Sequence, residues 1–321
     1  MTSYDFSTFA SRLHFRGLLR FDSALRIGAS RSSAVDEPDL PVLRDAAGRP
    51  YIPGSSFKGA LRGYIESVLR TLQSQEAIQD KNLACFSVGK PSARPQNDRA
   101  VELCLTQNEV SQLKAISPEN WRNDIDLAQA VKDRLPNQPS IVDKVQQAGE
   151  AAMLDDQLRQ LSCWTCRIFG SSWLASKVLI KDLHVQAWQD YQFEIRDGVG
   201  IDRDSGRAAD GAKYQFETIP VGTQFSLEIL AENLSEAELG VLWLGLRAFE
   251  QGDVLLGGAK SRGLGWCHLQ PQWATSHYVD QSSLLDYLFN IDRATDGLAA
   301  NQPQGWVQAF QTAITSEVSH A

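Results

Sequence analysis

The order of strand and helix patterns is the feature that most constrains how this chain can fold. Residues 13–27 alternate in part between apolar and polar side chains, as a strand does, and the segment after Gly54 has apolar residues at helical spacing. Further patterns indicate two strands, a second helix and a last strand: 178–188, 221–232, 235–251 and the residues after 265. This order is the ferredoxin-like βαββαβ plan, so the sequence predicts an α+β fold with one such unit.

Three stretches lie outside that plan. Residues 71–160 are rich in Gln, Asn and Asp and contain five prolines, which indicates an insertion with short helices. Residues 196–220 carry many charges and repeated glycines but few apolar side chains, which is typical of a long hairpin or an arm. The residues from 271 onward are expected to form a helical or loosely held tail.

Both predicted helices have recognisable starts. Ser235 and Glu238 stand at the two positions of a capping box. The first helix has Ser55 or Ser56 as its expected N-cap. It also carries Lys58 and, one turn later on the same face, Arg62. Backbone N–H groups, the helix dipole and these cations favour an anion at that end.

Composition and charge limit the class of protein. Of 321 residues, 43% are apolar and 22% charged, which is ordinary for a globular chain, and no run of 18 apolar residues predicts a membrane span. The start of the chain lacks a secretory pattern, so we expect a cytoplasmic protein without a membrane partner. The net charge is −8, but residues 11–70 contain ten Lys/Arg and six Asp/Glu. Such a local basic surface suits a phosphate-bearing partner, and solvated arginines are the alternative.

The glycine-rich stretch 256–265, "LGGAKSRGLG", follows a predicted helix and leads into a strand. A nucleotide-binding glycine loop has the opposite context, so the pattern does not favour ATP or NAD. Glycines here can allow close approach of the backbone to a ligand, with charge from Lys260 and Arg262. A flexible connector is the alternative.

Four of the five cysteines form a candidate metal site. Cys163 and Cys166 make a C-x2-C pair, which is half of a typical zinc site. Cys85 and Cys104 are the expected partners, so that structural Zn²⁺ would pin the 71–160 insertion. A histidine in place of one cysteine, a redox pair and inert thiols are the alternatives.

Six motifs occur in order along the chain: "RIG" (26–28), "LPVLRD" (40–45), "PYIPGSSFKGALR" (50–62), "CRIFG" (166–170), "RDGVGIDRDSGRA" (196–208) and "LGGAKSRGLG" (256–265). Together they resemble the RAMP superfamily of CRISPR-associated proteins, over roughly residues 13–70 and 163–270. The chain is most similar to the Csm/Cmr-like backbone subunit of type III effector complexes. Its C-x2-C pair looks like the zinc-carrying type III-D branch.

The resemblance implies a domain plan. It predicts an RRM-like core formed by residues 11–70 and 161–270, and a thumb at 198–216 that wedges into the guide–target duplex. The insertion at 71–160 and the tail at 271–321 have no counterpart.

The resemblance also implies partners and RNA contacts. The subunit would stack head-to-tail with other subunits of the complex along a guide RNA (crRNA) that pairs with target RNA. The residues expected to hold RNA are Arg26, Ser55, Ser56, Lys58, Arg62, Lys260 and Arg262 in the core and Arg203, Arg207 and Lys213 in the thumb.

The same resemblance implies endoribonuclease chemistry on the target RNA. In "DLPVLRD" the family's aspartate corresponds to Asp39, with Asp36 as the alternative if the register differs. Such a carboxylate would hold Mg²⁺ or its water near the scissile phosphate. A scaffold without catalysis is one alternative. A stand-alone endoribonuclease that processes guide precursors is another, although such enzymes usually carry two of these folds.

Overall fold

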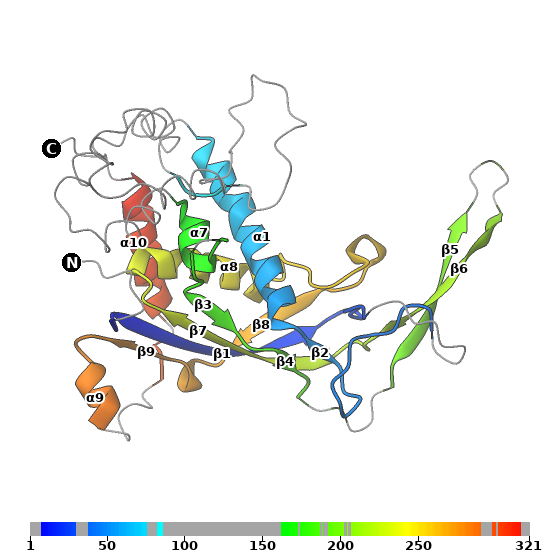
Figure 1. Ribbon diagram of the computed structural model, residues 1–321, viewed down its shortest axis with the longest axis horizontal. Helices are drawn as coiled ribbons and strands as arrows, with labels where there is room; N and C mark the ends of the chain where they lie inside the picture. Colours follow the sequence, from blue (N-terminus) through cyan, green and yellow to red (C-terminus); the bar gives the residue numbers. More distant parts are fainter. Residues whose placement is uncertain are drawn as a thin grey trace, which may run out of the picture.

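An antiparallel sheet with helices packed on one face forms the centre of the protein (Figure 1). The computed structural model describes residues 8–29, 38–75, 82–85, 162–172, 174–186, 188, 192–201, 204, 207–289, 297–299 and 301–315. The main sheet runs in the order β3-β7-β1-β8, and β9 pairs with the other half of β1. Its strands are β1 (Ser11–Phe21), β3 (Val178–Ile180), β7 (Gln224–Glu232), β8 (Cys267–Pro271) and β9 (His277–Asp280). The fold is therefore mixed α/β with antiparallel sheets.

The helices α1, α7, α8 and α10 lie on the same side of this sheet, whereas α9 lies near β9 on the other side (Figure 1). Their bounds are α1 (Gly54–Gln73), α7 (Trp164–Phe169), α8 (Glu236–Glu250), α9 (Leu284–Phe289) and α10 (Gln302–Thr315). No helix in the described ranges is long and apolar enough to cross a membrane.

Buried and partly exposed side chains alternate along β1, so the strand gives one face to the core and the other to the outside of the sheet. Leu13, Phe15 and Leu19 are at most 3% exposed, and successive strand residues point to opposite faces. The intervening residues are largely basic, as in Arg12 and Arg16. The expected strand at 13–27 ends at Phe21, after which the chain makes only isolated bridges.

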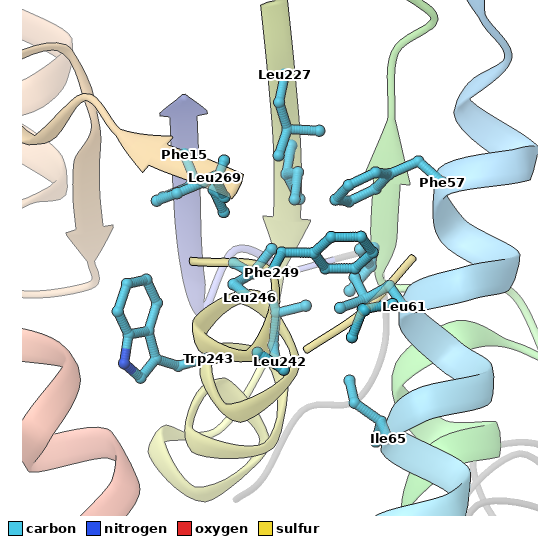
Figure 2. Close-up of a cluster of buried hydrophobic side chains, with 14 of the residues drawn as sticks. Phe15, Phe57, Leu61, Ile65, Leu227, Leu242, Trp243, Leu246, Phe249 and Leu269 are labelled. Carbon is cyan, nitrogen blue, oxygen red and sulfur yellow. The ribbon is translucent and has the colours of Figure 1, made fainter. Parts of the chain in front are cut away.

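The core lies between the sheet, α1 and α8 (Figure 2). The rings of Phe57 on α1 and Phe249 on α8 stack with centroids 4.7 Å apart. Gly245 allows the close approach of the two helices, because a Cβ there would lie 2.6 Å from both Leu61 and Ile65. The apolar face of α1 that the sequence predicts is thus the face that packs on α8.

The starts of the two helices differ from each other. The predicted capping box of α8 is confirmed, since Ser235 Oγ accepts from Glu238 N and the Glu238 carboxylate accepts from Ser235 N. The predicted serine N-cap of α1 is wrong. The N-cap is Pro53, and both serines lie in the first turn because the helix already starts at Gly54.

Two smaller sheets complete the described structure. One pairs β2 (Tyr51–Ile52) with β4 (Leu183–His184). The other is the antiparallel hairpin of β5 (Glu194–Ile201) and β6 (Ala208–Thr218), which extends away from the helices at the right of Figure 1. Among the residues of the expected sites, Asp36, Arg203 and Cys104 lie outside the described residues, as does most of the 71–160 segment.

Candidate nucleic-acid interface and thiol cluster

Four segments that are distant in the sequence meet where the β5–β6 hairpin leaves the core. We call this place the hairpin root and define it by Ala24, Leu40, Tyr214, Phe216, Ala259 and Leu264. Ala24, Phe216 and Leu264 are buried together, and the other three residues pack against them. The root therefore joins the segment after β1, the segment before β2, strand β6 and the glycine loop.

Asp39 lies at the hairpin root beside β6. Its Oδ2 accepts a hydrogen bond from the backbone N of Gln215 at 2.9 Å. The next residue, Leu40, donates its backbone N–H to Gln215 O at 3.2 Å and accepts from Glu217 N at 3.1 Å. These bonds fix the carboxylate of Asp39 beside the base of the hairpin.

Glu217 ties the same segment to β6 through its side chain. It is 6% exposed, its Oε2 accepts from Val42 N at 3.0 Å, and both its carboxylate oxygens lie 2.6 Å from Arg44 Nη2. Arg44 in turn lies over the ring of Phe193, 4.0 Å from its centroid. No pattern in the sequence indicates a role for Glu217, because only the fold brings it to Val42.

Arg26 lies between the glycine loop and β6. Its Cζ is 5.8 Å from the centroid of the Phe216 ring, within the range of a cation–π contact. Its backbone O accepts from Gly258 N at 2.8 Å. Its Nε is buried without a hydrogen-bond partner in the described structure. Gly257 has φ of +86°, and a Cβ there would lie 2.5 Å from Arg26 O, so glycine is required for this close approach.

The glycine loop presents further positive charge at the hairpin root. Lys260 and Arg262 lie in a short 3-10 turn and are exposed. Arg262 Nη1 donates a hydrogen bond to the hydroxyl of Tyr214. The Tyr214 ring packs over Gly198 of β5, where a Cβ would lie 2.2 Å from it. Two successive residues of β6 therefore make the two contacts. Tyr214 contacts Arg262, and Gln215 contacts Asp39.

Lys58 and Arg62, which the sequence predicts as phosphate ligands, donate hydrogen bonds to groups of the protein itself. Lys58 Nζ donates to Ser176 Oγ at 2.6 Å and to Val178 O at 3.1 Å. Burial, followed by the nearby Arg62, lowers the pKa of Lys58. The start of α1 also has an internal anion, since Gly54 N donates to Asp182 Oδ1 at 2.8 Å. RNA binding by Lys58 and Arg62 stays a prediction, and it would require these contacts to change.

The remaining predicted RNA contacts lie at the start of α1 and on the hairpin. Ser55 and Ser56 are exposed in the first turn of α1. Arg207 is exposed just before β6, and Lys213 lies within β6 opposite Val199. All four stay predictions.

Three cysteines form a buried cluster beside α1, in contact with its residue Arg62. The Sγ atoms of Cys85, Cys163 and Cys166 lie within 4.8 Å of one another, and each residue is at most 3% exposed. The Sγ atoms of Cys85 and Cys166 are 3.5 Å apart. Tetrahedral zinc with Zn–S bonds of about 2.3 Å separates its sulfur ligands by about 3.8 Å, so the cluster fits three positions of a thiolate metal site.

The sequence of this chain can be compared with those of known proteins. A family model described as "RAMP superfamily" matches residues 18–268, which is most of the chain. The chain belongs to the RAMP superfamily. This RAMP protein is also 21% identical over 266 residues to "CRISPR system Cms endoribonuclease Csm3" of Methanocaldococcus jannaschii, covering 80% of the chain and 78% of that relative. The family that the sequence motifs indicate is therefore confirmed.

Proposed function

We propose that this RAMP protein is a crRNA-binding backbone subunit of a type III CRISPR effector complex, and that it cleaves target RNA. The hairpin root carries the proposal, because Asp39 and the cations Arg26 and Arg262 all contact successive residues of one strand there. The similarity to Csm3 over four fifths of the chain supports the complex, and the word "endoribonuclease" in that relative's name supports the chemistry.

The core in this proposal is RRM-like. The chain order β1, α1, β3, β7, α8, β8 and the antiparallel sheet order β3-β7-β1-β8 support the βαββαβ plan. The β5–β6 hairpin extends from this core and supports the thumb at 198–216. Stacking along the guide follows from the family, and an open head-to-tail contact between copies gives a filament rather than a closed ring.

RNA phosphates would meet Arg26, Lys260 and Arg262 at the hairpin root. Lys260 and Arg262 are exposed on the glycine loop, and Gly257 lets this loop lie directly against Arg26 O. Phosphate contacts of this kind position an RNA without reading its sequence. A guide of any sequence could therefore occupy the same site.

Asp39 is the proposed carboxylate for cleavage of the target. Mg²⁺ is usually held by one or two carboxylates together with substrate phosphates, and Asp39 can supply one such ligand. Bound there, Mg²⁺ would offset negative charge on the scissile phosphate. The protein's own contribution is to hold Asp39 at the base of the hairpin through Gln215 and Glu217. The attacking group would be the 2′-hydroxyl of the RNA itself: its oxygen bonds to phosphorus, the bond from phosphorus to the 5′-oxygen breaks, and the 2′-hydroxyl proton is balanced by the proton that the leaving 5′-oxygen takes up, which gives a 2′,3′-cyclic phosphate and a 5′-hydroxyl.

The second candidate is a scaffold that binds RNA without cutting it. The hydrogen bond from Gln215 N to Asp39 Oδ2 favours it, because this bond gives the carboxylate a structural role in fixing the segment before β2. Both candidates share the same RNA-binding surface, so only the cleavage reaction separates them.

The thiol cluster is proposed to hold one structural Zn²⁺. Cys85, Cys163 and Cys166 supply three ligands, and Cys104 is the predicted fourth. Thiolates are preferred zinc ligands, and a bound metal would stabilise the segment that carries Cys85 against α1 and α7. Elemental analysis of freshly purified protein tests this point, since the proposal requires one zinc per chain.

Cleavage by the assembled complex tests the catalytic proposal. Asp39→Ala is expected to keep guide and target binding and to remove one cut from the ladder of target products in Mg²⁺. Asp36→Ala is the matched control and is expected to leave the ladder intact. The reverse result would move the catalytic residue to Asp36. An unchanged ladder for both variants would establish the scaffold.

A further inference from the structure

One face of α1 has a row of polar side chains, two of which contact cysteines of the thiol cluster. Arg62, Glu66 and Arg70 follow one another at intervals of four residues, and Gln73 comes three residues later. This spacing puts all four on one side of a helix. Glu66 is only 7% exposed, so the row is partly buried rather than a solvated surface.

Arg62 contacts the half of the cluster that belongs to α7. Its Nη2 lies 3.7 Å from Cys166 Sγ, within hydrogen-bond distance of sulfur. Its Nη1 donates to Gly170 O at 2.9 Å, just after the end of α7, and its Nε donates to Glu66 at 2.7 Å. One guanidinium therefore binds a cysteine sulfur, the end of the helix that carries that cysteine, and the neighbouring carboxylate.

Arg70 and Gln73 contact the other half. Arg70 Nη1 donates to Cys85 O at 3.2 Å. Gln73 Oε1 accepts from Leu83 N and Ala84 N at 3.1 and 3.2 Å. Segment 82–85 is thus held to α1 by three hydrogen bonds beside its cysteine. The row on α1 holds both parts of the chain that supply thiols.

The charges of the row suit a thiolate metal centre. Zn²⁺ with the three described thiolates carries one net negative charge, to which a fourth thiolate from Cys104 would add another, and hydrogen bonds to the coordinating sulfurs stabilise that charge. Two arginines and one glutamate give the row one net positive charge.

We propose that Arg62 is a positioning residue of the metal centre, donating to Cys166 Sγ and fixing α7 on α1, and that it is not an RNA contact. The proposal rests on the proposed zinc site. Glu66 accepts a hydrogen bond from Arg62, and Arg70 donates one to Cys85 O, so both residues help to position the same metal centre.

The test compares zinc affinity and RNA affinity in the full-length chain. Arg62→Gln is expected to weaken zinc binding by about 10–100-fold, the usual effect of removing a residue that supports a metal ligand. Zinc affinity is measured by competition with a chelating dye. RNA affinity is expected to stay within twofold of the wild type. Arg247→Gln, an exposed arginine on α8, is the matched control and is expected to change neither.

The outcomes separate this inference from the zinc site itself. Wild-type protein that binds no zinc would overturn both. A wild type that binds zinc, with unchanged affinity in Arg62→Gln, would overturn only the role of Arg62. Loss of RNA binding with intact zinc binding would make Arg62 an RNA contact.

A second variant covers the case in which Arg62→Gln does not fold. Arg62→Lys keeps the charge but lacks the forked geometry that reaches Cys166, Gly170 and Glu66 together. Its zinc affinity is expected to be severalfold lower than that of the wild type. Substitution of Co²⁺ adds a spectroscopic measurement, because the thiolate charge-transfer band is expected to shift in Arg62→Lys. Equal affinity and an unchanged band would overturn the proposal.

Discussion

Glu217→Ala is the variant that most directly perturbs the hairpin root without touching a proposed RNA contact. The Glu217 side chain is the acceptor for Val42 N and the partner of Arg44. Its removal is expected to loosen the segment that carries Asp39 while leaving the sheet and the helices unchanged.

The structure gives the size of the effect. The amide N–H of Val42, a residue only 2% exposed, would be left without its acceptor, which costs about 1–3 kcal/mol. The side chain of Arg44 is 38% exposed, so removing its ion pair adds at most about 1 kcal/mol after solvent screening. The free energy of unfolding is therefore expected to fall by about 1–4 kcal/mol. Glu217→Gln keeps an acceptor for Val42 N and is expected to reduce this free energy by only about 1 kcal/mol.

Two assays read out this prediction. Urea denaturation is expected to show a midpoint shift on the order of 1 M for Glu217→Ala. Target cleavage in the assembled complex is expected to slow about 10–100-fold, since small displacements of a reacting group are costly, with guide binding retained. Glu194→Ala on the same hairpin is the matched control, because its ion pair with Arg196 is exposed. Equal stability and cleavage for the two alanine variants would refute the reasoning.

Three further predictions concern other parts of the structure. Gly257→Ala is expected to destabilise the protein by about 2–4 kcal/mol, because it combines positive φ with a clash against Arg26 O. A Cβ at Gly258 meets the flexible tip of the Arg26 side chain at 3.3 Å and Arg26 O at an ordinary 3.8 Å. Gly258→Ala is therefore expected to cost under about 0.5 kcal/mol, and equal denaturation curves for the two variants would contradict the reasoning. Burial, then neighbouring cationic groups, lowers the pKa of His277 below its ordinary 6.5, so the unfolded chain binds this proton more readily. Stability is therefore full above pH 6.5 and decreases as the pH falls through the folded pKa, and His277→Gln is expected to flatten this slope in pH-dependent melting. Burial, followed by the charge of Asp22, raises the pKa of Cys267 to about 12, so iodoacetamide at a pH of about 8 is expected to modify it only after unfolding.

Periodicity in the sequence predicts the elements that build the core. The alternation in β1, the capping box at Ser235 and the apolar stripe of α1 each reflect a local rule, and each is found in the structure. The serine N-cap of α1 fails because Asp182, from a distant part of the chain, satisfies Gly54 N instead.

The candidate site is less predictable than the core. The sequence indicates the cations of the glycine loop and all three thiols of the described cluster. It does not indicate that Glu217 binds Val42, or that Tyr214 binds Arg262, since these pairs are separated by 175 and 48 positions. Lys58 and Arg62 show the converse: the sequence predicts a phosphate site on this basic face of the helix, whereas in the structure both side chains donate to the protein's own groups, and RNA binding there stays a prediction. Only tertiary packing distinguishes these uses of the same residue types.

The most direct test of RNA binding at the hairpin root is the RNA that co-purifies with the complex. Arg262→Glu reverses an exposed charge in the glycine loop, whereas Arg247→Glu makes the same change on α8. The account predicts that the first variant no longer retains the protected guide RNA. A milder Arg262→Ala is expected to reduce the salt dependence of RNA binding by about 0.7 in slope, because one cation fewer then neutralises a phosphate. The Arg247→Glu variant is expected to retain RNA of wild-type length and ends. Equal RNA content and equal salt dependence in the glycine-loop and α8 variants would contradict the account.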